Sequence, residues 1–124
     1  MKANERELLG LERKQVADFN RHEIEALLSH FDRGFVGFSS TRHERIGGSA
    51  KLSKTFRHYM NVSPKVRYAI SKPKVQMLGD NAVVSFYWKV QLAPGHVIDG
   101  RGTHVYAKKR AGWKIVHEHF SRSH

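Results

Sequence analysis

Two histidines separated by one residue, His117 and His119, are the most suggestive chemical groups in this 124-residue sequence. If they lie on a strand, both imidazoles share one face, because side chains alternate along a strand. Such a pair can bind a metal ion if a third ligand approaches, and His104 is a candidate. The pair can also transfer protons near neutral pH. We favour the simpler interpretation, in which both rings pack at an interface between subunits or hydrogen-bond across the sheet.

Other kinds of reactive site are excluded by what the sequence lacks. It contains no cysteine, so disulfides and thiol nucleophiles are excluded. It also contains no phosphate-binding loop, dinucleotide fingerprint or nucleophile elbow, and the Gly47-Gly48 pair lacks the necessary flanking spacing. We therefore predict no cofactor and no metal site, and we assign no catalytic residue.

The charge balance is strongly basic, with a formal net charge of +11 and a pI near 10.3. A basic surface attracts phosphates, in nucleic acids or in small anions. The lysines and arginines are scattered, however, apart from the 108–110 triplet beside a glycine that is typical of a hairpin tip. We therefore interpret them as solvated side chains and expect no nucleic-acid partner.

The first third of the chain is predicted to be helical. Apolar residues recur at near-helical spacing over residues 8–19. Asn20 is a suitable cap for a second helix, because Glu23 completes a capping box, and an apolar stripe then continues over residues 24–31. A third helix is predicted from Ser49 to about Tyr59.

The remainder alternates with the period of a β-sheet. Strands are predicted at residues 35–38, 66–77, 84–92, 98–108 and 113–121. The alternation slips by one residue around Ser71-Lys72-Pro73, which predicts a β-bulge. Because helices precede a meander of strands, the fold class is predicted to be α+β, in a single domain over residues 1–124.

Two segments carry a resemblance to known proteins. Residues 100–106 (GRGTHVY) and 112–121 (GWKIVHEHFS) resemble SnoaL-like proteins of the nuclear transport factor 2-like superfamily. They also resemble the association domain of calcium/calmodulin-dependent protein kinase II. The helical first half and the 79–84 turn and strand fit the same pattern. The resemblance implies a cone-shaped, curved antiparallel sheet with N-terminal helices on its concave face, a pocket between them, and a homodimer built through the sheet.

The resemblance leaves the activity open. Ketosteroid isomerase, in the same superfamily, uses a tyrosine and two acidic residues, and no such set matches here. Association domains carry an arginine-lined pocket, whereas this chain has His104 and Phe120 at two such positions. We therefore predict a small-molecule-binding protein or an enzyme of unassigned reaction. The alternative is a non-catalytic dimerisation or hub-like module.

The implied register also identifies candidate ligand-binding residues. It places His104 opposite Glu118, with Tyr106 and Phe120 on the same face, and Tyr87 is a candidate polar wall. A carboxylate beside an imidazole favours the charged ring, which would suit an anionic or carbonyl-bearing ligand. A register shifted by one residue would instead place His104 beside His117 and favour a metal or an acid–base pair.

The expected location is the cytoplasm. The N-terminal residues lack the apolar stretch of a signal peptide, and no apolar run has the length of a membrane-spanning helix. We therefore predict no membrane association.

Overall fold

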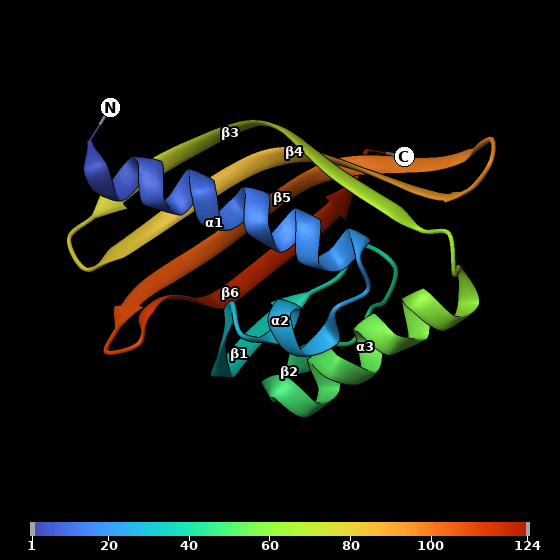
Figure 1. Ribbon diagram of the computed structural model, residues 1–124, viewed down its shortest axis with the longest axis horizontal. Coiled ribbons are helices and arrows are strands. Elements are labelled where there is room, and N and C mark those ends of the chain that lie inside the picture. Colours follow the sequence, from blue (N-terminus) through green and yellow to red (C-terminus); the bar gives the residue numbers. More distant parts are fainter. Residues whose placement is uncertain (1, 124) are drawn as a thin grey trace.

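A curved sheet of six strands packs against three helices in the computed structural model, which describes residues 2–123 (Figure 1). The helices are α1 (Ala3–Asn20), α2 (Ile24–Leu28) and α3 (Gly48–Val62). The strands are β1 (Phe31–Phe38), β2 (Ile46–Gly47), β3 (Arg67–Leu78), β4 (Asn81–Ala93), β5 (His96–Lys109) and β6 (Gly112–Arg122). Their order in the sheet is β2-β1-β6-β5-β4-β3. Only the β1–β6 pairing in this sheet is parallel, so the predicted α+β class is confirmed.

The long helix α1 crosses the concave face of the sheet (Figure 1) and buries a partly polar stripe. Leu8, Glu12, Gln15 and Phe19 are buried at intervals of three and four residues, which is the spacing of one helix face. Only two of these four are apolar. The buried face of α1 therefore brings hydrogen-bonding groups into the interior, and these need partners there.

The predicted boundary between the first two helices is wrong in detail. Asn20 is the last residue of α1, and its side chain hydrogen-bonds the backbone N–H and C=O of Tyr68, both at 2.8 Å. Glu23 occupies the cap position of α2, which ends at Leu28. Phe31 begins β1 instead of continuing the helical stripe. The long-range bond from Asn20 to β3 explains why its role as a cap is lost.

Two bulges set which side chains face inward. The predicted irregularity in β3 is confirmed, because pairing with β4 shifts between Ser71 and Lys74, and Lys72 has a φ of 52°. A second bulge lies in β6, where Val105 pairs with His117 but Tyr106 pairs with Ile115. Val116 is the extra residue. The pairing of His104 with Glu118 is as predicted.

Two glycines of β5, Gly100 and Gly102, lie where other parts of the protein pack closely against the strand. A Cβ at Gly102 would lie 2.5 Å from a ring carbon of Phe86, and one at Gly100 would lie 1.8 Å from the backbone oxygen of Ser121. The groups that approach these glycines are thus parts of the protein itself. The Phe86 ring can in turn contact His104, with ring centroids 5.0 Å apart.

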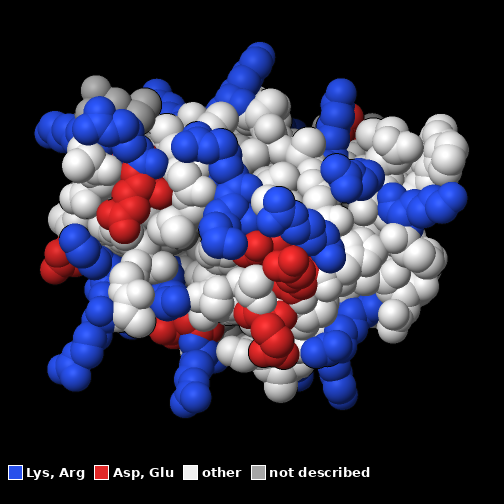
Figure 2. All heavy atoms as spheres, in the orientation of Figure 1, with Lys and Arg blue, Asp and Glu red and all other residues white. Residues whose placement is uncertain are grey.

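The surface carries the excess of basic side chains. Figure 2 shows lysines and arginines spread over the visible face, with acidic residues in small groups between them. This distribution agrees with the prediction of scattered, solvated cations. Within residues 2–123, none of the helices has the length and apolar character needed to cross a membrane.

Candidate functional site

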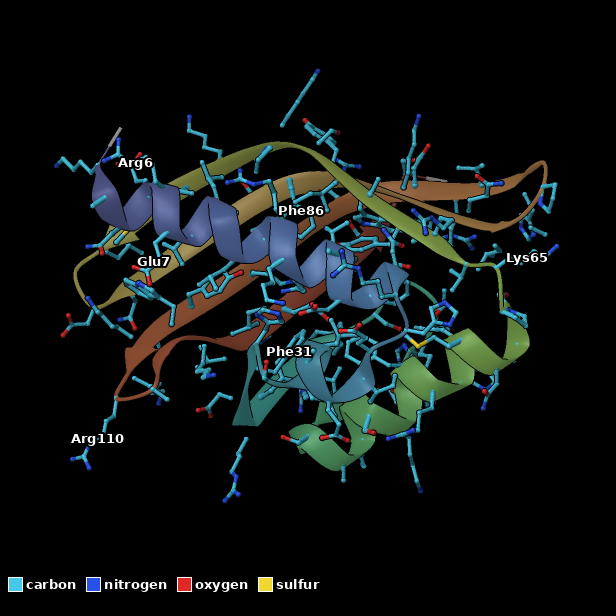
Figure 3. All side chains as sticks on the ribbon, in the orientation of Figure 1. Arg6, Glu7, Phe31, Lys65, Phe86 and Arg110 are labelled. Carbon is cyan, nitrogen blue, oxygen red and sulfur yellow. The ribbon has the colours of Figure 1, made fainter. Side chains whose placement is uncertain are left out.

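A cavity of about 120 Å³ lies between the sheet and the helices. Seven of its lining side chains are aromatic, namely Phe19, Phe31, Phe56, Tyr59, Tyr68, Trp88 and Phe120. Figure 3 shows Phe31 in the interior, whereas Lys65 and Arg110 extend away from the body of the protein. Among the described residues, the lining includes no Lys, Arg or His, and its one charged group is Glu118. The cavity is therefore apolar apart from a single carboxylate and a few neutral polar groups.

Glu118 connects the cavity to a buried histidine. Its Oε1 accepts a hydrogen bond from Nε2 of His104 at 2.7 Å, while the other ring nitrogen, Nδ1, donates to Oε2 of Glu12 at 2.7 Å. His104 is fully buried, and both of its ring nitrogens face carboxylates. Burial opposes protonation of the ring, but the charges and hydrogen bonds of Glu12 and Glu118 raise the pKa of His104 to about 10. The ring is therefore an imidazolium at neutral pH.

Tyr106 completes this arrangement. Its hydroxyl donates to Oε2 of Glu12 at 2.8 Å, and burial followed by the Glu12 charge raises the pKa of Tyr106 well above its ordinary value. We call Glu12, His104, Tyr106 and Glu118 the inner network. It combines two carboxyl groups, one imidazolium and one neutral phenol.

The inner network leaves polar atoms without partners. Oε2 of Glu118 has no hydrogen-bond partner among residues 2–123, and Glu118 is the member whose side chain keeps 12% exposure. Oε1 of Glu12 and the hydroxyl of Tyr68 are buried and also unpaired. Burial, followed by the charges of Glu12 and Glu118, raises the pKa of Tyr68. The tyrosine that lines the cavity beside the network therefore stays a neutral phenol.

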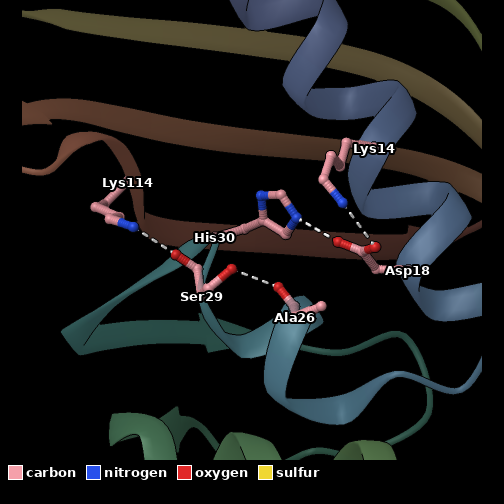
Figure 4. Close-up of polar contacts among 6 residues, drawn as sticks. All are labelled: Lys14, Asp18, Ala26, Ser29, His30 and Lys114. Atoms are coloured by element: carbon pink, nitrogen blue, oxygen red, sulfur yellow. Dashed lines mark hydrogen bonds and ion pairs between the residues drawn. The ribbon is translucent and has the colours of Figure 1, made fainter.

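A second pairing of histidine with carboxylate lies outside the cavity. Oδ2 of Asp18 pairs with Nε2 of His30 at 2.8 Å, and its Oδ1 accepts from Lys14 at 3.1 Å (Figure 4). Burial would raise the pKa of Asp18, but the hydrogen bonds from His30 and Lys14 lower it below its ordinary value. We call Lys14, Asp18 and His30 the outer cluster. None of the three lines the cavity. The contact between Asp18 and His30 joins α1 to the residue that precedes β1, so the role of the cluster is structural.

The structure brings four of the five predicted site residues together. Glu118 and Phe120 line the cavity, while His104 and Tyr106 are buried behind it. The interpretation of His104 as a cationic donor inside the cavity is wrong, because both of its nitrogens are engaged by carboxylates. Tyr87 is on the opposite face of the sheet and 53% exposed, so its interpretation as a wall of this cavity is also wrong.

The histidine pair of β6 faces away from the cavity. The rings of His117 and His119 pack near Phe38, with centroid distances of 6.4 and 5.3 Å. Within residues 2–123, no group of three His, Asp or Glu side chains is placed to hold a metal ion. The structure therefore has the first of the two registers, in which His104 is paired with Glu118 and not with His117.

Sequence reasoning missed the contribution of α1. The apolar spacing of this helix did not single out Glu12 or Gln15, although both are buried and Gln15 lines the cavity. The signal was present in the spacing, because residues 8, 12, 15 and 19 follow one helix face more regularly than the apolar residues do. A charged residue on such a face indicates a buried partner elsewhere, here His104.

Comparison with known proteins shows which family model the chain matches and which solved structures share its fold. The family model described as a SnoaL-like domain matches residues 13–123, whereas no curated protein matches the chain. Among solved structures, a nuclear transport factor 2-like protein of unknown function from Pseudomonas putida KT2440 is 17% identical, with a TM-score of 0.89 over 96% of this chain and 86% of that one.

Two further solved structures share the fold. A protein from Xanthomonas campestris, named as a candidate calcium/calmodulin-dependent protein kinase II association domain, is 20% identical, with a TM-score of 0.83 over 94% of this chain and 86% of that one. A protein of unknown function with a cystatin-like fold from Nostoc punctiforme is 15% identical, with a TM-score of 0.81 over 99% and 94%. At these identities the likeness is one of fold.

Proposed function

The chain belongs to the SnoaL-like domain family, and from that premise we propose that it binds a small molecule in the cavity between its sheet and its helices. The observation that carries this proposal is the cavity itself, which is mainly apolar and contains one carboxylate whose Oε2 has no hydrogen-bond partner among residues 2–123. Apolar walls with a few placed polar groups are typical of small-molecule sites. The protein then acts as a binding protein or as an enzyme whose reaction is unassigned.

Each member of the site has a distinct part in this proposal. Glu118 contacts the ligand through Oε2, where it can accept a hydrogen bond or a proton, and Phe120 supplies an apolar surface beside it. His104 is a positioning residue, because its Nε2 fixes Oε1 of Glu118 at 2.7 Å. Glu12 and Tyr106 hold His104 from behind.

A ligand screen on a filled cavity tests the proposal. Compounds that raise the melting temperature of the wild type should lose that effect in Val90→Phe, which adds bulk at a lining position. Val97→Phe is the matched control, because Val97 lies on the same sheet at 50% exposure and outside the lining. Ligands that bind Val90→Phe as tightly as the wild type would show that the cavity is not their site.

The convex face supports a second part of the proposal, a homodimer built through the sheet. This face carries a groove of about 520 Å³ whose lining includes Ile70, Tyr87, Lys89 and Arg101. Tyr87 and Val97 are large apolar side chains left exposed at 53% and 50%. A second copy would cover such groups. If dimerisation were the whole function, as in a hub-like module, filling the cavity would have no consequence. Whether the protein binds a ligand or acts as a dimerisation module, we expect it in the cytoplasm.

A further inference from the structure

We propose that the cavity selects a small organic cation, an ammonium ion substituted with methyl or other short apolar groups. The inference rests on the proposed function and names the chemical class of its ligand. It departs from the sequence-based expectation of an anionic or carbonyl-bearing ligand, because the structure turns His104 away from the cavity and leaves Glu118 facing it.

The first argument is the sign of the charge around the cavity. The chain as a whole carries a net charge of +11, yet the charged group in the described lining is a carboxylate. The two carboxyl groups of the inner network share one histidine, and the carboxyl group that faces the cavity is that of Glu118. An anion placed beside it would be repelled in a medium of low dielectric constant, whereas a cation would be attracted.

The second argument is the arrangement of aromatic rings. Phe31, Phe56, Phe19, Tyr68, Phe120 and Trp88 form a continuous series in which neighbouring ring centroids lie 5.4 to 6.4 Å apart. All six rings line the cavity. Aromatic rings attract cations, and cages of such rings bind quaternary ammonium groups. A methylated ammonium also suits an apolar wall better than a strongly hydrated one, because removing water from an ion is costly.

The third argument is size. The cavity volume is about 120 Å³, whereas an apolar cavity of about 150 Å³ holds a benzene molecule. A trimethylammonium group has dimensions comparable to those of benzene. Ser39, Thr41 and Tyr59, whose hydroxyls are hydrogen-bonded to one another, also line the cavity. They can pair with a hydroxyl on a short ligand chain.

A pair of isosteric compounds tests the charge directly. Calorimetric titration with choline is compared with 3,3-dimethylbutan-1-ol, in which carbon replaces the charged nitrogen. We expect choline to bind at least about tenfold more tightly, because the shape is shared and only the charge interactions differ. Equal affinities, tighter binding of the alcohol, or binding of neither compound would each overturn the cation proposal. In each of these cases the proposed function would still hold if other ligands bind the wild type and lose that binding in Val90→Phe.

Two variants locate the effect. Glu118→Gln keeps an oxygen for His104 and should remove the preference for choline over the alcohol, because only choline carries a charge for the carboxylate to attract. Phe120→Leu keeps an apolar wall but removes a ring, so it should weaken choline more than the alcohol. Asp18→Asn, which removes an acidic group outside the cavity, is the matched control and should retain the preference. If Glu118→Gln retains the preference as well, with its fold verified by thermal unfolding, the assignment to this carboxylate is wrong.

The same trimethylammonium group occurs on lipid head groups, so the source needs its own measurement. Co-sedimentation with phosphatidylcholine vesicles that is lost in Glu118→Gln would assign the group to a lipid. Choline binding without co-sedimentation would assign it to a free solute. Either result supports the ligand chemistry, and vesicle binding that Glu118→Gln leaves intact would contradict it.

Discussion

The inner network and the outer cluster use the same chemistry on the same helix, with different consequences. Each pairs a carboxylate of α1, Glu12 or Asp18, with a histidine at 2.7 or 2.8 Å. In the outer cluster the second partner of Asp18 is Lys14, whose side chain is 62% exposed. In the inner network the chain of contacts instead ends on Glu118, at the cavity. The same pairing of carboxylate and histidine thus fastens two elements together where it meets solvent and forms part of a candidate site where it meets a cavity.

Removing a carboxylate from the inner network is the most damaging test of this comparison. We expect Glu12→Leu to lower the free energy of unfolding by about 3–5 kcal/mol, because it breaks a buried ion pair and leaves a charged partner behind. The Tyr106 hydroxyl also loses its acceptor. Denaturant unfolding measures the change. A loss below about 1 kcal/mol, the range of exposed ion pairs, would show that the network is not held as the structure indicates.

The two regions should also respond to opposite ends of the pH scale. The pKa of His104 is raised from 6.5 to about 10, so its contribution to stability is complete below pH 6.5 and is lost as the pH rises towards 10. We expect a loss on the order of 2 kcal/mol from about pH 7 to about pH 9. The pKa of Asp18 is lowered from 3.8, so its contribution is present above that value and is lost as the pH falls further.

Unfolding curves recorded across both ranges check this prediction. Glu12→Gln should flatten the alkaline decline, because it removes one of the two charges that raise the pKa of His104. An alkaline decline of the same size in this variant would assign the effect to other groups.

Removing the carboxylate of the outer cluster should cost less. We expect Asp18→Asn to lower the free energy of unfolding by about 1.5–3 kcal/mol, the range for a hydrogen bond to a charged group. The asparagine oxygen can still pair with His30, and Lys14 is free to turn to water. Ligand affinity should be unchanged. If Asp18→Asn lowered the free energy of unfolding as much as Glu12→Leu does, the outer cluster and the inner network would not differ in the way proposed.

A substitution that touches neither region provides the baseline. We expect Tyr87→Ser to change the stability of the folded chain by less than about 0.5 kcal/mol. If the convex face forms the proposed dimer, the same variant should shift the molar mass measured by light scattering from two chains to one. A wild type that is already a 14.3 kDa monomer at micromolar concentration would refute the dimer.

The sequence predicts this fold better than it predicts the site. The β3 bulge and the inward residues of β4 follow from alternation and from Pro73, which are local signals. The contact between Glu12 and His104 joins residues 92 positions apart, and no local pattern encodes it. The direction of the β6 side chains was ambiguous for a related reason. Strict alternation from Trp113 and Ile115 would place His117 and His119 inside, and the bulge at Val116 reverses this.

That bulge also has a genetic consequence. Because Val116 is the residue without a regular partner, an in-frame loss of its codon would leave Ile115 and Glu118 on the concave side of a now regular strand. Loss of the codon for His119, where pairing is already regular, would instead turn Phe120 outward. The hairpin end of the molecule can therefore change in length by one residue without redirecting the carboxylate, while the second half of β6 cannot.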